Sequence, residues 1–301
     1  MGASLPQPLV RPLQIYAFDP SLGRRHGNHA HITVPHEPLE AGPRGRRVEV
    51  VDFDGSNNCY YQPVDLEDPR VLIAGGLAPS ESDPRFHQQM VYGVVSKTLE
   101  AFRKALGRPV EWRRQGRRAF RGAPRLRIYP HAMQEANAYY DADSHALLFG
   151  YFAAADAPGG LNLAGQTIFS CLSHDIVAHE ATHAIVHDVR RFFMHPSGPD
   201  TLAFHEAFAD IVALLQHFTF TEAVVDHILG TGGVLFRPEL APLVARSAPS
   251  SLNEPGGGRP ATMAEEAQRN VLVGLAQQFG EAMGLRAALR SALGSPADPA
   301  E

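Results

Sequence analysis

The chain has 301 residues, of which 44% are hydrophobic and 20% are charged, and its formal net charge is −5. This composition excludes a disordered tail, and the sequence contains no run of eighteen apolar residues of the kind that spans a membrane. The slight acidity disfavours nucleic acid and anionic lipid as partners. We therefore expect a globular protein with no nucleic-acid or membrane partner, built as one large domain or as two lobes that share a cleft.

The first 170 residues are expected to form a strand-rich lobe, because many Gly and Pro residues separate short β-type runs there. A long amphipathic helix is predicted at 86–107, where apolar residues recur at helical spacing and Gly107 can end the helix. Two runs at 136–140 and 146–152 are joined by turn-forming residues and predict a hairpin. The other predicted strands are 13–18, 47–53, 71–74 and 126–129.

Residues 171–301 are expected to form a mainly helical lobe. Ser173 and Asp200 can each cap a helix, and Thr262 begins a capping box for a third. The stretch 248–260 is rich in Pro, Gly and Ser and predicts a surface loop. The fold class is therefore α+β with two lobes.

The sequence has two cysteines, Cys59 and Cys171. This number excludes a disulfide framework and any CxxC metal motif, but it leaves a single bridge open. A bound metal is therefore expected to be held by His and carboxylate side chains. The first residues do not form a signal peptide, so a cytoplasmic location is the default expectation, and a precursor trimmed before Met1 would have the same sequence.

The most informative segment is 173–186, which contains an HExxH motif. His179 and His183 are four residues apart on a predicted helix, so both imidazoles leave the same face and can bind one zinc ion. Glu180 then lies beside the metal without binding it. A solvated helix face is the alternative for this segment.

A zinc site with two His ligands needs a third protein ligand. His187 is excluded because it lies about 12 Å along the helix axis from His179. The metzincin pattern is excluded because its Gly and third His are missing. Glu206 on the next predicted helix is the natural third ligand, and Asp210, one turn later, can accept a hydrogen bond from a zinc-binding His. Both could instead be surface acids. The same stripe of this helix also carries Ala213 and His217.

Segment 175–184, with HExxH, and segment 205–211, with ExxxD, together resemble the thermolysin-like (M4-type) gluzincin zinc metallopeptidases. The similarity covers about residues 85–220 and implies a two-lobed zincin with the HExxH helix at the cleft. It implies one zinc per chain on His179, His183 and Glu206, with Glu180 as catalytic base. It also implies that Asp210 orients a ligand, and that Asn137 and Ala138 in an edge strand bind the peptide backbone of the substrate. An ordinary hairpin strand is the alternative for these last two residues.

The sequence also departs from that family. The family's transition-state Tyr is missing near Met194, and no His follows His227, although the family has a second catalytic His downstream of the glutamate ligand. Either the helical lobe is incomplete in this chain or another donor, such as His195, takes that role. His217 stands where the family has a calcium-binding glutamate, so calcium is not expected.

Two functions follow as hypotheses. The first is a zinc metallopeptidase that hydrolyses a peptide or protein substrate with a Glu-activated, zinc-bound water. The second is a gluzincin-like domain that binds zinc or peptide without turnover, because the donor for the oxyanion is missing.

Overall fold

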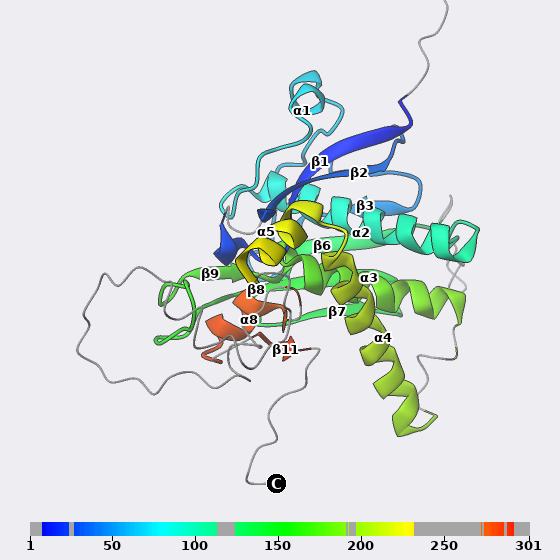
Figure 1. Cartoon of the computed structure of the whole chain (residues 1–301). Helices are drawn as coiled ribbons and strands as arrows, with labels where there is room; N and C mark the ends of the chain where they lie inside the picture. The colour runs from blue at the N-terminus through cyan, green and yellow to red at the C-terminus, as the bar shows by residue number, and fades with distance from the viewer. Residues whose placement is uncertain are drawn as a thin grey trace, which may run out of the picture.

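The structure is a computed structural model, and it describes residues 8–23, 27–112, 124–190, 192, 197–231, 272, 274–285 and 288–291. The fold of these residues is mixed α+β, as predicted (Figure 1). The helices are α1 (Pro69–Ile73), α2 (Pro84–Leu106), α3 (His174–Val189), α4 (Pro199–His217), α5 (Thr221–Thr231) and α8 (Gln277–Ala282), with 3-10 turns η1 (Pro20–Leu22) and η3 (Ser170–Leu172). The strands are β1 (Val10–Tyr16), β2 (His29–Pro35), β3 (Val48–Val50), β4 (Phe53–Asp54), β5 (Cys59–Tyr60), β6 (Leu126–Met133), β7 (Ala138–Asp141), β8 (Ala146–Ala153), β9 (Thr167–Phe169), β10 (Gly274–Leu275) and β11 (Arg290–Ser291).

The main sheet has the order β3-β6-β8-β7, and β9 pairs with the far part of β8. Strands β3, β6 and β8 are parallel to one another, whereas β7 is antiparallel to β8. The pairing of β7 with β8 confirms the predicted hairpin. Among the described strands β7 pairs with β8 alone, so it lies at an edge of the sheet that they form.

Helix α2 confirms the long helix predicted in the first part of the chain. Asp83 accepts a hydrogen bond from the Arg85 N–H at 3.0 Å, and Pro84 occupies the first helical position. Gly107 ends the helix in a left-handed conformation, with φ 67°. The helix packs against β3, β6 and α3.

Helix α3 is buried on almost every side, because it packs against α2, α4 and strands β7 and β8 (Figure 1). Its many Ala residues allow these close approaches. The buried side chains around it form one cluster that extends from Leu13 to Leu275, on both sides of the predicted boundary at residue 170. The helix with the HExxH motif is therefore held rigidly in the core.

Two local predictions were wrong. Residues 71–74 were expected to form a strand, but 71–73 belong to the short helix α1 and Ala74 is its C-cap. This helix starts at Pro69, after the capping side chain of Asp68. Asp200 was expected to cap a helix, but α4 begins at Pro199 with Gly198 at the cap position, so Asp200 lies inside the first turn.

One other local prediction was right, and two concern residues outside the described ranges. Ser173 is at the cap position of α3, as predicted, although its side chain makes no capping hydrogen bond. The two cysteines are free, so they form no bridge. The loop at 248–260 and the capping box at Thr262 lie outside the described residues.

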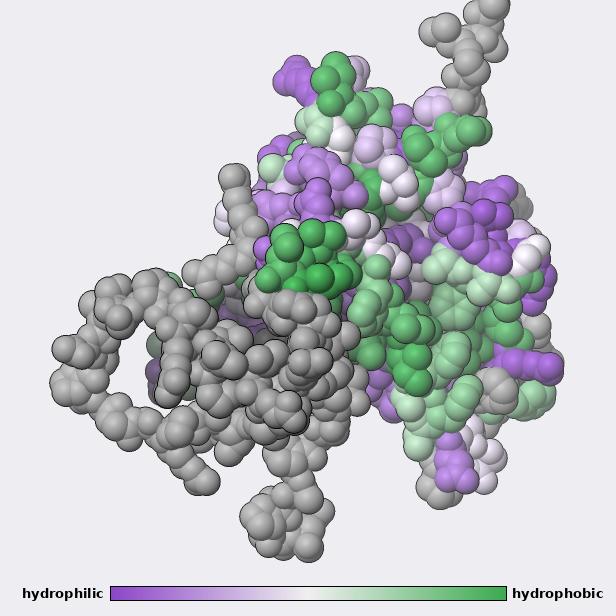
Figure 2. Space-filling view, viewed as in Figure 1, coloured by the Kyte–Doolittle hydropathy of each residue, from purple (hydrophilic) through white to green (hydrophobic). Residues whose placement is uncertain are grey.

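Apolar side chains gather on the exposed surfaces of α4 and α5 (Figure 2). Within the described ranges, no single helix has both the length and the apolar character needed to cross a bilayer. Segments 200–217 and 221–229 meet that test only when they are taken together, and they are bent by 76°. The exposed apolar residues on these helices are Leu202, Phe204, Ile211, Leu215, Val225, Ile228 and Leu229.

The aromatic side chain of Phe149 in β8 is fully buried in the core between the sheet and its helices. We expect Phe149→Ala to lower the free energy of unfolding by about 3–5 kcal/mol, because the variant loses buried apolar contacts and leaves a cavity. Urea unfolding measures this change. Ile73→Ala, at a side chain that is 89% exposed, is the control and is expected to change stability by less than about 0.5 kcal/mol. Equal effects would contradict the assignment of Phe149 to the core.

Candidate metal centre

Two neighbouring helices bring three donor side chains to one point. His179 and His183 leave the same face of α3, and their Nε2 atoms lie 2.9 Å apart. Glu206 on α4 points at both, with carboxylate oxygens 3.4 Å from Nε2 of His179 and 3.3 Å from Nε2 of His183. The three residues predicted as ligands are therefore adjacent in space.

These distances suit a zinc ion. Two ligand atoms at about 2.1 Å from a tetrahedral zinc lie about 3.4 Å apart, which is close to the two distances that involve Glu206. Two imidazoles and one carboxylate are a known catalytic donor set for zinc. Hydrogen bonds to His179 and His183 hold the pKa of Glu206 well below its usual value. The carboxylate is therefore ionised at neutral pH, as a metal ligand must be.

Each ring of the pair is held by a second hydrogen bond. The Nδ1 atom of His179 lies 2.8 Å from a carboxylate oxygen of Asp210, which matches the orienting role predicted for Asp210. The Nδ1 atom of His183 lies 2.5 Å from Nδ1 of His205. With Nδ1 protonated in both rings, each Nε2 presents a lone pair to the metal position. Burial lowers the pKa of His179, but the bonds to Asp210 and Glu206 outweigh this effect and raise it to about 9 in the protein without metal.

Glu180 lies beside this donor set, with one carboxylate oxygen within 4.8 Å of donor atoms of His179 and His183. The side chain is buried, and one of its oxygens accepts a hydrogen bond from the backbone N–H of Tyr140 at 2.9 Å. Burial raises the pKa of Glu180, although the two nearby imidazoles oppose this effect. A carboxylate with a raised pKa beside a metal position is suited to accept and release a proton.

A pocket with a volume of about 330 Å³ opens next to Glu180. Strand β7 with the residues just before it, helices α3 and α4, and the described residues near β10 and α8 contribute to its wall. Asn137 and Ala138, which were predicted to bind substrate, both line it. The complete lining is Ala136, Asn137, Ala138, Asp175, Ile176, His179, Glu180, Asp210, Ala213, Leu275, Ala276, Phe279, Met283 and Leu289.

The hydrogen-bond pattern of β7 directs part of its backbone toward this pocket. The Gly150 N–H donates to the Asn137 carbonyl at 2.9 Å, and bonded pairs alternate along an antiparallel ladder. The backbone groups of Ala138 and Tyr140 therefore point away from β8. Tyr140 uses its N–H to hold Glu180, and the Ala138 N–H is 2.9 Å from the side-chain oxygen of Asn137.

The structure brings together seven of the predicted site residues: His179, Glu180, His183, Glu206, Asp210, Asn137 and Ala138. His195 lies outside the described residues. His187, which was excluded as a ligand, instead has its Nδ1 2.9 Å from the Tyr140 hydroxyl. Sequence reasoning missed the role of His205 as the partner of His183, although its position directly before Glu206 placed it beside the site.

In the comparisons with known proteins, no family model and no curated protein matched this chain. The description of the site therefore depends on the geometry of its own residues.

Asp210 is expected to raise zinc affinity without touching the ion. We predict that Asp210→Asn binds zinc about 10- to 100-fold more weakly, because the amide cannot accept the His179 Nδ1–H bond as a carboxylate does. Competition with a chromogenic chelator measures the affinity. Unchanged affinity would show that Asp210 does not orient His179 in the loaded protein.

A buried ion pair fixes the far end of this helix pair. His217 Nε2 lies 2.5 Å from Asp175 Oδ1, and Asp175 Oδ2 accepts from the Ala276 N–H at 3.1 Å. Burial lowers the pKa of His217, but Asp175 outweighs this and raises it; burial likewise raises the pKa of Asp175, and His217 outweighs this and lowers it. Below about pH 6.5 the pair therefore joins α3, α4 and the start of α8 as charged partners.

We expect His217→Gln to lower the free energy of unfolding by about 3–5 kcal/mol near pH 6, because it leaves the Asp175 carboxylate buried without its cation. The raised pKa of His217 makes its contribution complete below about pH 6.5, and this contribution is lost as the pH rises through the folded pKa. The lowered pKa of Asp175 makes its contribution complete above about pH 4, and this is lost in acid. Urea unfolding of the wild type and of His217→Gln across this pH range measures the pH dependence. A difference in unfolding free energy that does not change with pH would contradict it.

Proposed function

We propose that this protein is a zinc-dependent metallopeptidase of the gluzincin type, which hydrolyses peptide bonds. The observation that carries the proposal is the convergence of His179, His183 and Glu206 from two helices, with Glu180 beside them. Two imidazoles and one carboxylate leave room for water on a bound zinc, which is the arrangement of catalytic rather than structural sites. A two-lobed zincin architecture, with the HExxH helix at the floor of the cleft, is part of this proposal.

Zinc, when bound, acts as a Lewis acid and lowers the pKa of a coordinated water. Glu180 is the general base in this scheme: its carboxylate accepts a proton from the attacking water and passes it to the leaving amine. The bond from the Tyr140 N–H keeps one oxygen of Glu180 fixed during these transfers. The raised pKa of Glu180 helps it to hold the proton between the two steps.

The substrate is expected to bind as an added strand along β7. Ala138 offers its backbone groups on the open side of this strand, next to the pocket, after the Asn137 side chain releases the Ala138 N–H. Tyr140 cannot serve in the same way, because its N–H is bound to Glu180. Main-chain recognition of this kind fits an extended peptide of varied sequence.

The second candidate is a domain that binds zinc or peptide without turnover. One observation favours it: among the described residues that line the pocket, none is Tyr, Arg or Lys, and the one His is a proposed zinc ligand. Catalysis needs a donor for the developing oxyanion, and loss of one such donor typically costs about 10²- to 10³-fold in rate. His195 is the candidate donor that the sequence offers.

Turnover of casein, an unstructured substrate, separates the two functions. The peptidase proposal predicts cleavage that is abolished by a chelator and restored by added zinc. Cleavage that a chelator leaves unchanged would contradict a metal-dependent reaction. Zinc binding without cleavage at any enzyme concentration would favour the second candidate.

A further inference from the structure

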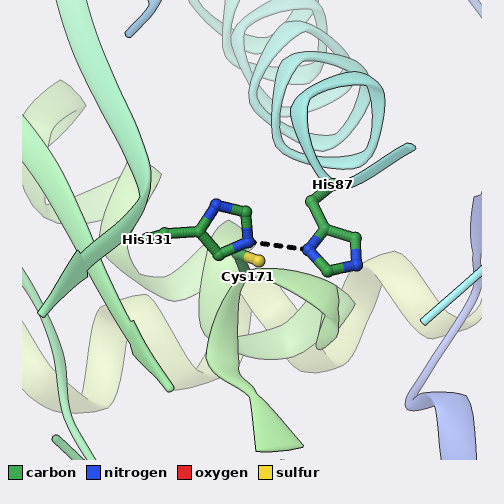
Figure 3. A group of neighbouring side chains, drawn as sticks. All are labelled: His87, His131 and Cys171. Atoms are coloured by element: carbon green, nitrogen blue, oxygen red, sulfur yellow. Dashed lines mark hydrogen bonds between the residues drawn. The ribbon is translucent and has the colours of Figure 1, made fainter. Parts of the chain in front are cut away.

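A second group of metal-binding side chains lies in the core, apart from the HExxH site. His87 on α2 and His131 on β6 face each other, with His87 Nδ1 2.8 Å from His131 Nε2, and the sulfur of Cys171 in η3 lies beside them (Figure 3). Their donor atoms are all within 4.8 Å of one another. The three residues are each no more than 1% exposed.

In each ring the outer nitrogen, which is the one that faces away from the other ring, already has a partner that accepts a hydrogen bond. His131 Nδ1 lies 2.6 Å from a carboxylate oxygen of Asp52, whose other oxygen accepts from the Gln88 side chain. His87 Nε2 lies 3.0 Å from the carbonyl oxygen of Glu81, which can only accept. In both neutral rings the proton therefore belongs on the outer nitrogen.

This assignment leaves two lone pairs facing each other at 2.8 Å. Two neutral imidazoles carry two protons, whereas the three contacts made by the rings need three. The third contact therefore needs either one more proton, on a ring or on Asp52, or a metal ion between the rings. A metal ion accepts both lone pairs at once, and the Asp52–His131 contact is the carboxylate–histidine arrangement that commonly orients a metal-binding imidazole.

We propose that His87, His131 and Cys171 form a second, structural metal site that takes Zn²⁺. Two imidazoles and a thiolate are suitable zinc donors. The charges also balance, because one divalent ion neutralises the Asp52 carboxylate and the Cys171 thiolate in a buried pocket. Zinc at about 2.0–2.1 Å from each nitrogen requires the rings to separate by about half an ångström from their present spacing.

An irregularity in the pairing of β6 with β8 directs His131 toward this cluster. The pairing of β6 with β8 shifts register between Tyr129 and Met133, and the consecutive residues Pro130 and His131 are both buried instead of alternating. Such an irregularity turns the His131 side chain into the core. Rings of Phe169 and Tyr151 lie against His131, with centroids 5.4 and 6.2 Å away, and shield the cluster from water.

A metal here would link three elements that are far apart in the sequence. Cys171 is two residues before Ser173, the cap position of α3. The site would therefore fix the start of the HExxH helix to α2 and β6, without contact with the proposed catalytic zinc. Its loss is expected to lower thermal stability more than it changes the geometry of the catalytic site.

Cobalt substitution tests the second site in the full chain. After metal removal, added Co²⁺ is expected to give thiolate-to-cobalt charge-transfer absorption in the near ultraviolet. The HExxH site has no sulfur ligand, so Glu206→Ala should retain this absorption even if the peptidase proposal fails. Cys171→Ala should lose it, and Cys59→Ala, which changes the other cysteine, is the matched control that should retain it.

Zinc content gives a second measurement. We expect two zinc ions per chain in the wild type and one in Cys171→Ala or in Glu206→Ala. If Cys171→Ala does not fold, the spectra of the wild type and of Cys59→Ala still test the site. The chain has two cysteines, so thiolate absorption that remains in Cys59→Ala must come from Cys171. A wild-type cobalt spectrum without thiolate absorption, or absorption that disappears in Cys59→Ala, would overturn the proposal.

Discussion

Glu180→Gln is expected to lower the turnover of a peptide substrate by about 10²- to 10⁴-fold while zinc remains bound. The amide has nearly the same shape as the carboxylate, and its oxygen can still accept the Tyr140 N–H, but it cannot take a proton from water. Casein cleavage under conditions that saturate the site with zinc measures the effect.

The control for this variant is Glu222→Gln, which changes an exposed carboxylate on α5 and should leave both turnover and zinc content unchanged. Metal analysis of Glu180→Gln is needed as well, because loss of zinc would explain inactivity in another way. Wild-type activity in a fully zinc-loaded Glu180→Gln protein would contradict the role of Glu180 as base.

Glu206→Ala is expected to remove the metal from the HExxH site and to weaken its zinc affinity by more than about 100-fold, because the variant loses a direct ligand. Zinc that is bound only to the folded state stabilises it by about 4 kcal/mol at a thousand times the Kd. The rise in Tm that zinc produces at this site should therefore disappear in the variant. Calorimetry with and without added zinc measures it.

Asp200→Ala is a matched control on the same helix. Asp200 is an exposed acid in the first turn of α4, so its loss should affect helix stability slightly and zinc binding not at all. Equal zinc affinity in Glu206→Ala and Asp200→Ala would contradict the assignment of Glu206 as the third ligand.

The arrangement of the candidate site could be predicted from the sequence because helical periodicity determines which residues share a face. His179 and His183 are four apart on one helix, and so are Glu206 and Asp210 on the next. Once both segments are helical and packed together, little freedom is left in how these side chains meet. The edge position of β7 was implied by the resemblance alone, because a hairpin with β8 does not determine which strand lies at the edge of the sheet.

Contacts between distant segments could not be predicted in this way. His87, His131 and Cys171 lie on a helix, a strand and a 3-10 turn, and no spacing in the sequence relates them. The strand predicted at 71–74 failed for another reason: the short apolar run Val71–Ile73 has no decisive periodicity, and the Asp68-Pro69 start signal decided the outcome. The contact of His205 with His183 could not be predicted either, because it depends on the packing of α4 on α3.

Anomalous diffraction at the zinc edge from a crystal of the zinc-loaded protein tests the central claim most directly. We predict an anomalous peak about 2.0–2.2 Å from Nε2 of His179, from Nε2 of His183 and from a carboxylate oxygen of Glu206, with Glu180 outside the coordination shell. A zinc-loaded crystal with no peak between these residues, or with Glu206 turned away from it, would contradict the account.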